Sequence, residues 1–215
     1  MSGKDEPIVV REGYPFIGLA GALALFTAAV DLHGLAWILL FATFAVGAFF
    51  RNPFRRIPQD PRAVLCPADG RILEVQRQEE DALLTGPHWK VSIFMSPLDV
   101  HVNRAPVSGI VRKKIYHPGC FHVASLQIAS TENERMEMVV EAGAGFEVGI
   151  VQVAGRIARR IVCYPQEGDS LMRGERFGLI RFGSRVELYL PGEVTPTVQV
   201  GQRVKAGETI MGHVP

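Results

Sequence analysis

Two long uncharged runs near the start of the chain constrain its fold more than any other feature. Residues 14–30 form the first run and residues 35–50 the second, and Asp31-Leu-His-Gly34 separates them. As an α-helix, each run reaches roughly 25 Å at about 1.5 Å per residue, slightly less than a hydrocarbon core of about 30 Å. The pattern predicts a helical hairpin that either spans the bilayer or dips into one leaflet.

Charged residues flank this predicted hairpin. Lys4 and Arg11 precede the first run, and three arginines lie in residues 51–58 after the second. Positive charge on both sides places both ends at the cytoplasmic face of the cell membrane. We expect residues 51–58, whose prolines end the helix, to form a connector whose arginines meet anionic headgroups. The alternative, a buried hairpin in a soluble protein, fits poorly with so uniform an apolar surface.

From residue 59 onward the pattern changes to short alternating segments separated by Gly and Pro turns. One short helix is expected over residues 169–176. The remainder predicts a mainly β domain, a sandwich or barrel-sandwich, so that residues 1–58 and 59–215 form two domains. The predicted strands are residues 71–76, 89–94, 107–116, 136–141, 146–153 and 157–164.

Two segments of the β domain echo each other. Residues 67–73 and 200–210 resemble the two half-motifs of lipoyl- and biotinyl-type barrels. Lys205 does not lie in the sequence context in which such barrels are modified. The resemblance therefore predicts architecture and no carrier function.

Charge and cysteine content exclude several classes of protein. The net charge is +1, which gives no basis for binding nucleic acid. The three cysteines, Cys66, Cys120 and Cys163, are widely spaced and form no CxxC pair. This spacing fits neither a disulfide framework nor a zinc motif. His117 and His122 flank a Pro-Gly turn, but no second ligand pair follows, so no metal site is predicted.

Residues 177–191 combine two strand-like segments with Gly183-Ser184 between them. The simplest interpretation is a β-turn or bulge. Glycine also permits strained backbone dihedrals, in which the next residue's hydroxyl can press against the glycine carbonyl carbon. An N-to-O acyl shift would then convert the peptide bond to an ester.

The segment Arg181-Phe-Gly-Ser-Arg-Val186 before a short C-terminal tail resembles the maturation site of the phosphatidylserine decarboxylase family, in its short form. The resemblance implies cleavage between Gly183 and Ser184. It implies a β chain of residues 1–183 and an α chain of residues 184–215 that remain associated. Ser184 would become a pyruvoyl group, the cofactor of these enzymes.

A second segment, Ser96-Pro-Leu-Asp-Val-His101, resembles the family's Ser-Pro-x-Asp-x-His motif. On an extended strand Asp99 and His101 share a face. The plain alternatives are a turn cap for Asp99 and a structural histidine for His101. The resemblance transfers to Asp99 a role in self-cleavage, and His101 is our first candidate for the acid that reprotonates the product.

The family's downstream histidine has no counterpart in residues 139–150, and a further family histidine aligns with Arg104. Proton transfer must therefore come from elsewhere, and His101, His117 and His122 are the candidates. Asn133-Glu-Arg135 also matches the family. It either orders the site or pairs with substrate phosphate, and the alternative is a solvated turn.

The implied reaction converts phosphatidylserine to phosphatidylethanolamine and CO₂ through a Schiff base between the lipid amine and the pyruvoyl ketone. Its implied partners are a phospholipid and the membrane, and self-association is left open. Two alternatives remain: a decarboxylase of another serine-headed lipid, such as an archaeal ether lipid, and a non-enzymatic membrane-tethered barrel-sandwich module.

Overall fold

The structure is a computed structural model that describes residues 7–79, 83–156, 160–181 and 183–214. The chain divides into two compact units, Met1–Phe54 and Arg55–Pro215. Each unit is described by itself below.

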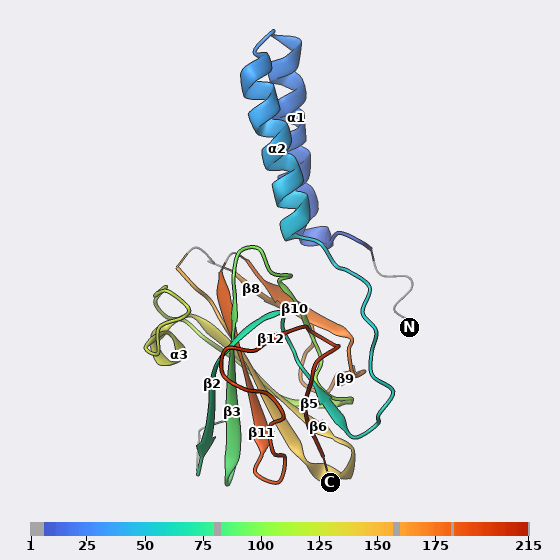
Figure 1. The fold of residues 1–215 in the computed structure, drawn as a ribbon, viewed down its shortest axis with the longest axis vertical. Helices are drawn as coiled ribbons and strands as arrows, with labels where there is room; N and C mark the ends of the chain where they lie inside the picture. Colours follow the sequence, from blue (N-terminus) through green and yellow to red (C-terminus); the bar gives the residue numbers. More distant parts are fainter. Residues whose placement is uncertain (1–6, 80–82, 157–159, 182, 215) are drawn as a thin grey trace. The chain divides into compact units, whose positions relative to one another are not determined.

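The first unit is a helical hairpin, as the two apolar runs predicted. A 3₁₀ turn η1 (Arg11–Gly13) leads into α1 (Tyr14–Ala29), and α2 (His33–Phe49) packs alongside it (Figure 1). Backbone hydrogen bonds close the base of the hairpin, from Val10 N to Phe50 O (3.0 Å) and from Asn52 N to Ile8 O (2.6 Å).

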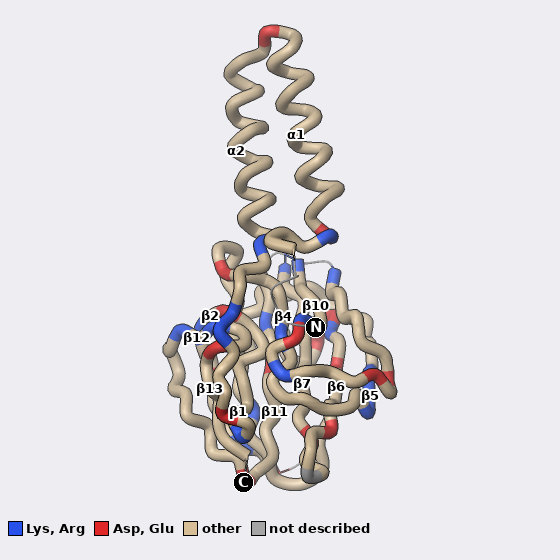
Figure 2. Tube along the Cα trace, turned by 90° about the vertical axis from the view of Figure 1, so that its right-hand side faces the viewer, with Lys and Arg blue, Asp and Glu red and all other residues tan. Residues whose placement is uncertain are grey.

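The two helices are apolar on their outer surfaces as well as at their contact. Figure 2 shows Lys, Arg, Asp and Glu at the ends of the hairpin and none along the helices. Leu25, Trp37 and Phe41 are each more than 70 % exposed. Residues 11–29 form the one described helix that is long and apolar enough to cross a membrane, and α2 is shorter. A surface of this kind is stable only against an apolar medium or partner.

The second unit is mainly β, as predicted. Its described residues contain thirteen strands, one short helix α3 (Ala129–Glu132) and a 3₁₀ turn η2 (Gly143–Gly145) (Figure 1). The strands are β1 (Ala63–Leu65), β2 (Gly70–Gln78), β3 (His88–Met95), β4 (Val102–Arg104), β5 (Gly109–His117), β6 (Arg135–Ala142), β7 (Glu147–Val153), β8 (Ile161–Cys163), β9 (Ser170–Leu171), β10 (Arg176–Ile180), β11 (Ser184–Pro191), β12 (Arg203–Val204) and β13 (Ile210–His213).

The strands form one large curled sheet and two small ones. The large sheet has the order β12-β2-β3-β11-β7-β6-β5-β9, and the small sheets are β4-β10-β8 and β1-β13. All pairings are antiparallel. The apolar faces enclose a main core that includes Ile93, Val186 and Leu188, and a smaller cluster that includes Val151 and Tyr189 lies apart from it. In the large sheet β11 lies between β3 and β7, so it is an interior strand that is paired on both edges.

The two segments that echo each other lie side by side. β12 pairs with β2, Cys66 N donates to Thr209 O (2.8 Å), and Ala206 N donates to Asp69 Oδ1 (2.8 Å). This pairing supports the architectural resemblance to lipoyl-type half-motifs. It also places the C-terminal tail against the first strands of the unit.

Two sequence expectations were wrong. Residues 169–176 form no helix: they contain β9 and a turn at Gly174, which has φ +80°, and Glu175 Oε2 accepts the Met172 N–H (2.8 Å). The left-handed backbone at Gly174 is incompatible with a helix through this segment. Arg55 does not project toward headgroups, because its side chain is buried and paired with Asp69 (2.8 Å). The predicted strands all occur, and their predicted ends differ from the observed ends by a few residues. Residues 157–159, the start of the strand predicted over 157–164, lie outside the described residues.

Candidate active site

Gly183 is the point at which the chain passes from one sheet to another. β10 belongs to the three-stranded sheet, and β11 starts at Ser184 in the large sheet. The two strands therefore do not pair as a hairpin. Gly183 has φ +66°, which a residue with a side chain rarely adopts. No atom lies within 4 Å of a Cβ built at Gly183, so backbone conformation, not space, requires glycine there. Phe182 lies outside the described residues.

Ser184 is fully buried at the first position of β11. It is paired with Met95 of β3, and its Oγ lies 3.4 Å from the Met95 Sδ. A thioether is a weak acceptor, so this contact holds the hydroxyl only loosely. The hydroxyl is thus shielded from water and lies next to the Gly183 peptide.

His101, in the segment before β4, contacts the backbone N–H of Gly183, which is one peptide bond before the Gly183–Ser184 bond. Its Nε2 accepts the Gly183 N–H (3.4 Å), and its Nδ1 lies 3.0 Å from the Asp99 backbone oxygen. A carbonyl oxygen can only accept, so Nδ1 carries the proton and Nε2 presents its lone pair toward Gly183. The ring is buried. The contacts therefore define a neutral imidazole with its basic nitrogen at the Gly-Ser junction.

The Asp99 carboxylate caps the turn that presents His101. Its Oδ2 accepts the Ser96 N–H (2.8 Å), and its Oδ1 lies 3.7 Å from Arg203 Nη1. Asp99 lies in a turn, so its link to His101 is through its backbone oxygen and not through a shared strand face. The structure thus places His101 against Gly183, the residue before Ser184, and Asp99 contacts the other side of the His101 ring through its backbone oxygen.

The Gly183 carbonyl lies against Gly155, which follows β7. A Cβ added to Gly155 would lie 2.0 Å from the Gly183 oxygen. Asn133 fixes this region from the other side: it is fully buried, and its Nδ2 donates to Ala154 O (2.7 Å) and His122 O (2.9 Å). Asn133 is therefore an ordering residue and not part of a solvated turn.

Arg185, which sequence reasoning did not single out, anchors the residue after the serine in a buried charge network. Its Nε lies 3.0 Å from Glu187, and its Nη2 donates to Ser92 Oγ (2.8 Å). Its Nη1 donates to Leu126 O (3.2 Å), in the same loop as Asn133. Lys90 lies 3.1 Å from Glu187 on the opposite side. Arg185 and Glu187 are both nearly inaccessible to solvent.

A buried amide pair lies beside Met95. Gln152 Nε2 donates to Asn103 Oδ1 (2.8 Å), and Asn103 Nδ2 lies 3.8 Å from the Met95 Sδ. Among the described residues, Gln152 Oε1 has no hydrogen-bond partner although it is buried. Burying a polar group without a hydrogen bond costs free energy, and this pair, with its unpartnered Gln152 Oε1, borders the thioether that Ser184 contacts.

The remaining candidates have other partners. Arg104 donates to Gly174 O (2.9 Å), His117 lies 3.1 Å from Glu137, and His122 lies 3.0 Å from Glu132. Of the three candidate histidines, His101 is thus the one that contacts Gly183. Alternation in β7 places Gln152 on the same face as Val148 and Ile150, which could have indicated its burial. Alternation in β11 would instead place Glu187 on a polar face, and its burial follows only from the structure, in which both faces of β11 are covered.

Comparison with known proteins gives one consistent result. The phosphatidylserine decarboxylase family profile matches residues 42–212. The chain is 47 % identical over 210 residues to the phosphatidylserine decarboxylase proenzyme of Burkholderia pseudomallei strain 1106a, covering 98 % of this chain and 97 % of the relative. It is 47 % identical over 206 residues to the same-named protein of Desulfotalea psychrophila, covering 96 % of each chain. With that of Paraburkholderia phymatum it shares 46 % over 209 residues, covering 97 % of this chain and 98 % of the relative.

The buried charge network predicts a large stability effect. Glu187→Gln removes the carboxylate that faces both Arg185 and Lys90, and leaves the buried Arg185 and the partly buried Lys90 without its charge. We expect this to lower the free energy of unfolding by about 3–5 kcal/mol. At about 2–4 °C per kcal/mol, the thermal midpoint should fall on the order of 10 °C in a detergent-solubilised melt followed by near-UV circular dichroism.

Glu193→Gln is the matched control, because Glu193 is exposed just after β11. Its midpoint should stay within about 2 °C of wild type, since surface substitutions seldom exceed about 0.5 kcal/mol. Equal midpoints for the two variants would show that the Glu187 pairs contribute nothing to stability.

Proposed function

The chain belongs to the phosphatidylserine decarboxylase family, and we propose that it is a self-cleaving proenzyme that decarboxylates phosphatidylserine at a membrane surface. The observation that carries the proposal is the buried Gly183-Ser184 junction. There a left-handed glycine, a shielded hydroxyl and a basic imidazole nitrogen meet. The family name of the relatives describes both the substrate and the precursor state.

The first stage rearranges the chain itself. Ser184 Oγ attacks the Gly183 carbonyl carbon, its proton passes to the amide nitrogen, and the C–N bond breaks to leave an ester and a free amine. Loss of the Ser184 Cα proton then expels the Gly183 carboxylate and leaves dehydroalanine at position 184. Water replaces the nitrogen of that residue, ammonia departs, and a pyruvoyl group remains at the start of β11.

The described residues suit these steps. Burial of Ser184 excludes bulk water, which would otherwise hydrolyse the ester. His101 Nε2 is in the tautomer that can accept a proton. Gly155 leaves room for the Gly183 carbonyl oxygen while the carbonyl carbon becomes tetrahedral. The Asp99 backbone oxygen fixes the orientation of the His101 ring, and the Asp99 carboxylate caps the turn at the Ser96 N–H.

The pyruvoyl carbonyl would supply the electron sink for loss of CO₂ from an amine-linked substrate. The chain holds this position firmly, because β11 pairs with β3 over residues 184–191 and with β7 over residues 185–189. The α chain should therefore stay in the sheet after cleavage. The exposed apolar hairpin would keep the enzyme at the cytoplasmic membrane face, where the lipid headgroup is available.

Decarboxylation of phosphatidylserine vesicles tests the proposed function. Wild-type protein should release CO₂ and form phosphatidylethanolamine. Ser184→Ala has no hydroxyl to attack Gly183, so it should remain a single chain and release no CO₂ above background. Ser170→Ala, which changes an exposed serine in β9, should behave like wild type. Full activity in uncut Ser184→Ala protein would refute the proposal. An inactive wild type that stays a single chain would favour the non-enzymatic alternative, and one that is cut but inactive would favour a different serine-headed lipid.

Asp99 and His101 can be separated by their chemistry. Asp99→Asn keeps an oxygen for the Ser96 N–H but loses the charge, so slow cleavage would mean that the charge matters. His101→Ala should slow processing or turnover by about 10²–10⁴-fold, the usual worth of a general acid or base. The rates come from the loss of full-length chain after cell-free synthesis and from CO₂ release by processed protein.

His213→Ala is the control, because His213 is an exposed histidine in the separate β1–β13 sheet, where it lies 3.2 Å from Asp60. Cleavage and turnover at wild-type rates in His101→Ala would clear His101 of both roles. Normal cleavage in Asp99→Asn would reduce Asp99 to a turn cap.

Gly155→Ala tests whether the scissile carbonyl must lie where the structure places it. The added methyl would lie 2.0 Å from the Gly183 oxygen, so the junction must shift. A displacement of about 1 Å costs about 10²-fold in rate, and the full-length chain should persist correspondingly longer on a denaturing gel. Gly143→Ala is the control, because nothing lies within 4 Å of its added methyl. Equal cleavage rates in both variants would rule out this placement.

A further inference from the structure

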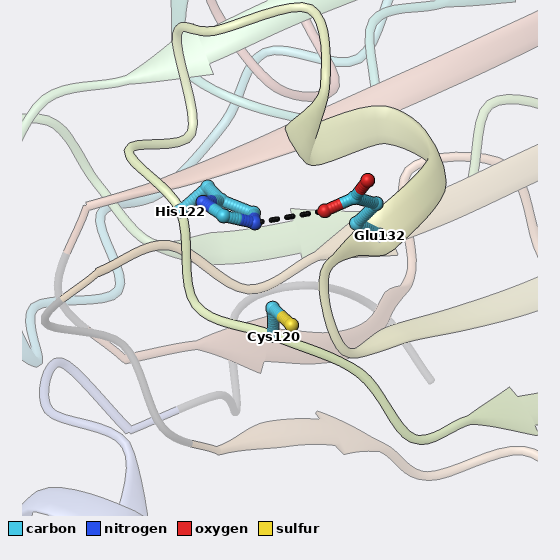
Figure 3. A group of neighbouring side chains, drawn as sticks. All are labelled: Cys120, His122 and Glu132. Carbon is cyan, nitrogen blue, oxygen red and sulfur yellow. Dashed lines mark hydrogen bonds and ion pairs between the residues drawn. The ribbon is translucent and has the colours of Figure 1, made fainter.

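Three side chains with different donor atoms converge on the loop between β5 and β6. Cys120 offers sulfur, His122 an imidazole nitrogen and Glu132 a carboxylate oxygen, and these atoms all lie within 4.8 Å of one another. Figure 3 shows the His122 ring and the Glu132 carboxylate facing each other, with the Cys120 sulfur beside them. His122 Nε2 lies 3.0 Å from Glu132 Oε2. The sequence predicted no metal site because no second ligand pair follows His117 and His122. The three residues brought together here are a different combination, which includes His122 but not His117.

The backbone already fixes all three positions. Cys120 N donates to Glu132 O (2.7 Å), and Glu134 N donates back to Cys120 O (3.0 Å). The side chain of Asn133, which is fully buried, bonds both backbone groups of His122, at 2.8 and 2.9 Å. Gly119 permits this approach, because a Cβ there would lie 2.3 Å from Glu132 O. Binding would therefore cost little ordering of the main chain.

The donor set selects the kind of cation. Calcium and magnesium prefer oxygen ligands, whereas one sulfur, one nitrogen and one oxygen suit zinc and its neighbours. Three protein ligands leave a fourth tetrahedral position for water. The side chains of His122 and Glu132 are 38 % and 51 % exposed, so a cation can enter from solvent. The cation would take the place of the present His122–Glu132 hydrogen bond.

The other two cysteines do not compete. Burial raises the pKa of the Cys66 thiol to about 12 and that of Cys163 to about 11, so both remain protonated near neutral pH. Cys120, in contrast, is exposed. It is thus the cysteine best placed to ligate a metal.

We propose that Cys120, His122 and Glu132 form a three-ligand site for a zinc-type divalent cation. The site adjoins the Gly-Ser junction through its backbone supports. Asn133 bonds Ala154 O, and the next residue, Gly155, lies against the Gly183 carbonyl. An occupied site therefore braces the loop that packs on the junction. This inference does not depend on cleavage or decarboxylation.

Metal titration of the full-length protein tests the site. The protein is purified without an affinity tag, kept reduced with a phosphine, freed of metal with a chelator and titrated with Zn²⁺ against a chromophoric competitor. We expect one equivalent to bind. Co²⁺ should give the thiolate-to-metal absorption band and the intense visible bands of a tetrahedral site. Cys120→Ser should abolish the thiolate band and weaken Zn²⁺ binding by at least tenfold.

Matched variants assign the other ligands. His122→Asn and Glu132→Gln should each weaken binding at least tenfold, while Cys163→Ser and His213→Asn should bind like wild type, because those residues lie outside the cluster. Circular dichroism of each variant shows whether it is folded. Absence of a stoichiometric Zn²⁺ equivalent in wild type, or binding that Cys120→Ser leaves unchanged, would overturn the proposal.

Discussion

The architecture depends on one strand being held from both sides. β11 starts at Ser184 and is paired with β3 and β7, so the residue after Gly183 is fixed in the middle of the large sheet. The preceding strand, β10, ends at Ile180 and belongs to another sheet. Gly183 absorbs the change of direction with a left-handed backbone. A peptide bond at the start of a strand that is paired on both edges is well suited to a reaction that must cut the chain without unfolding it.

The surroundings of that bond combine shielding with a few directed polar groups. His101 presents an unprotonated nitrogen to the Gly183 N–H, and Gly155 gives the carbonyl oxygen space that any side chain would fill. Arg185, the residue after Ser184, is held in a buried charge network with Glu187 and also donates to Leu126 O in the loop between β5 and β6. Buried charges of this kind add little net stability, but they penalise any other register of β11. The network thus fixes the geometry of the junction.

Much of this could be predicted from sequence, and the remainder follows from contacts between distant residues. Uninterrupted apolar runs indicated the hairpin, and period-two alternation indicated most strands of the β unit. Residues 169–176 were misread because Gly174 and the Glu175 cap turn a helix-like composition into a turn. Arg55 was misread because its partner Asp69 lies in a different segment. Gly155, Arg185 and the Asn103–Gln152 pair were missed, since only tertiary structure brings them to the Gly-Ser junction.

The central claim is that the Gly183–Ser184 bond breaks itself and leaves a carbonyl at the head of β11. Intact-mass analysis of purified, active protein under denaturing conditions tests it most directly. The account predicts two chains, residues 1–183 and 184–215, with the smaller lacking a free α-amino group and reacting with a carbonyl reagent. A single chain of 215 residues in fully active protein, with no reactive carbonyl, would contradict it.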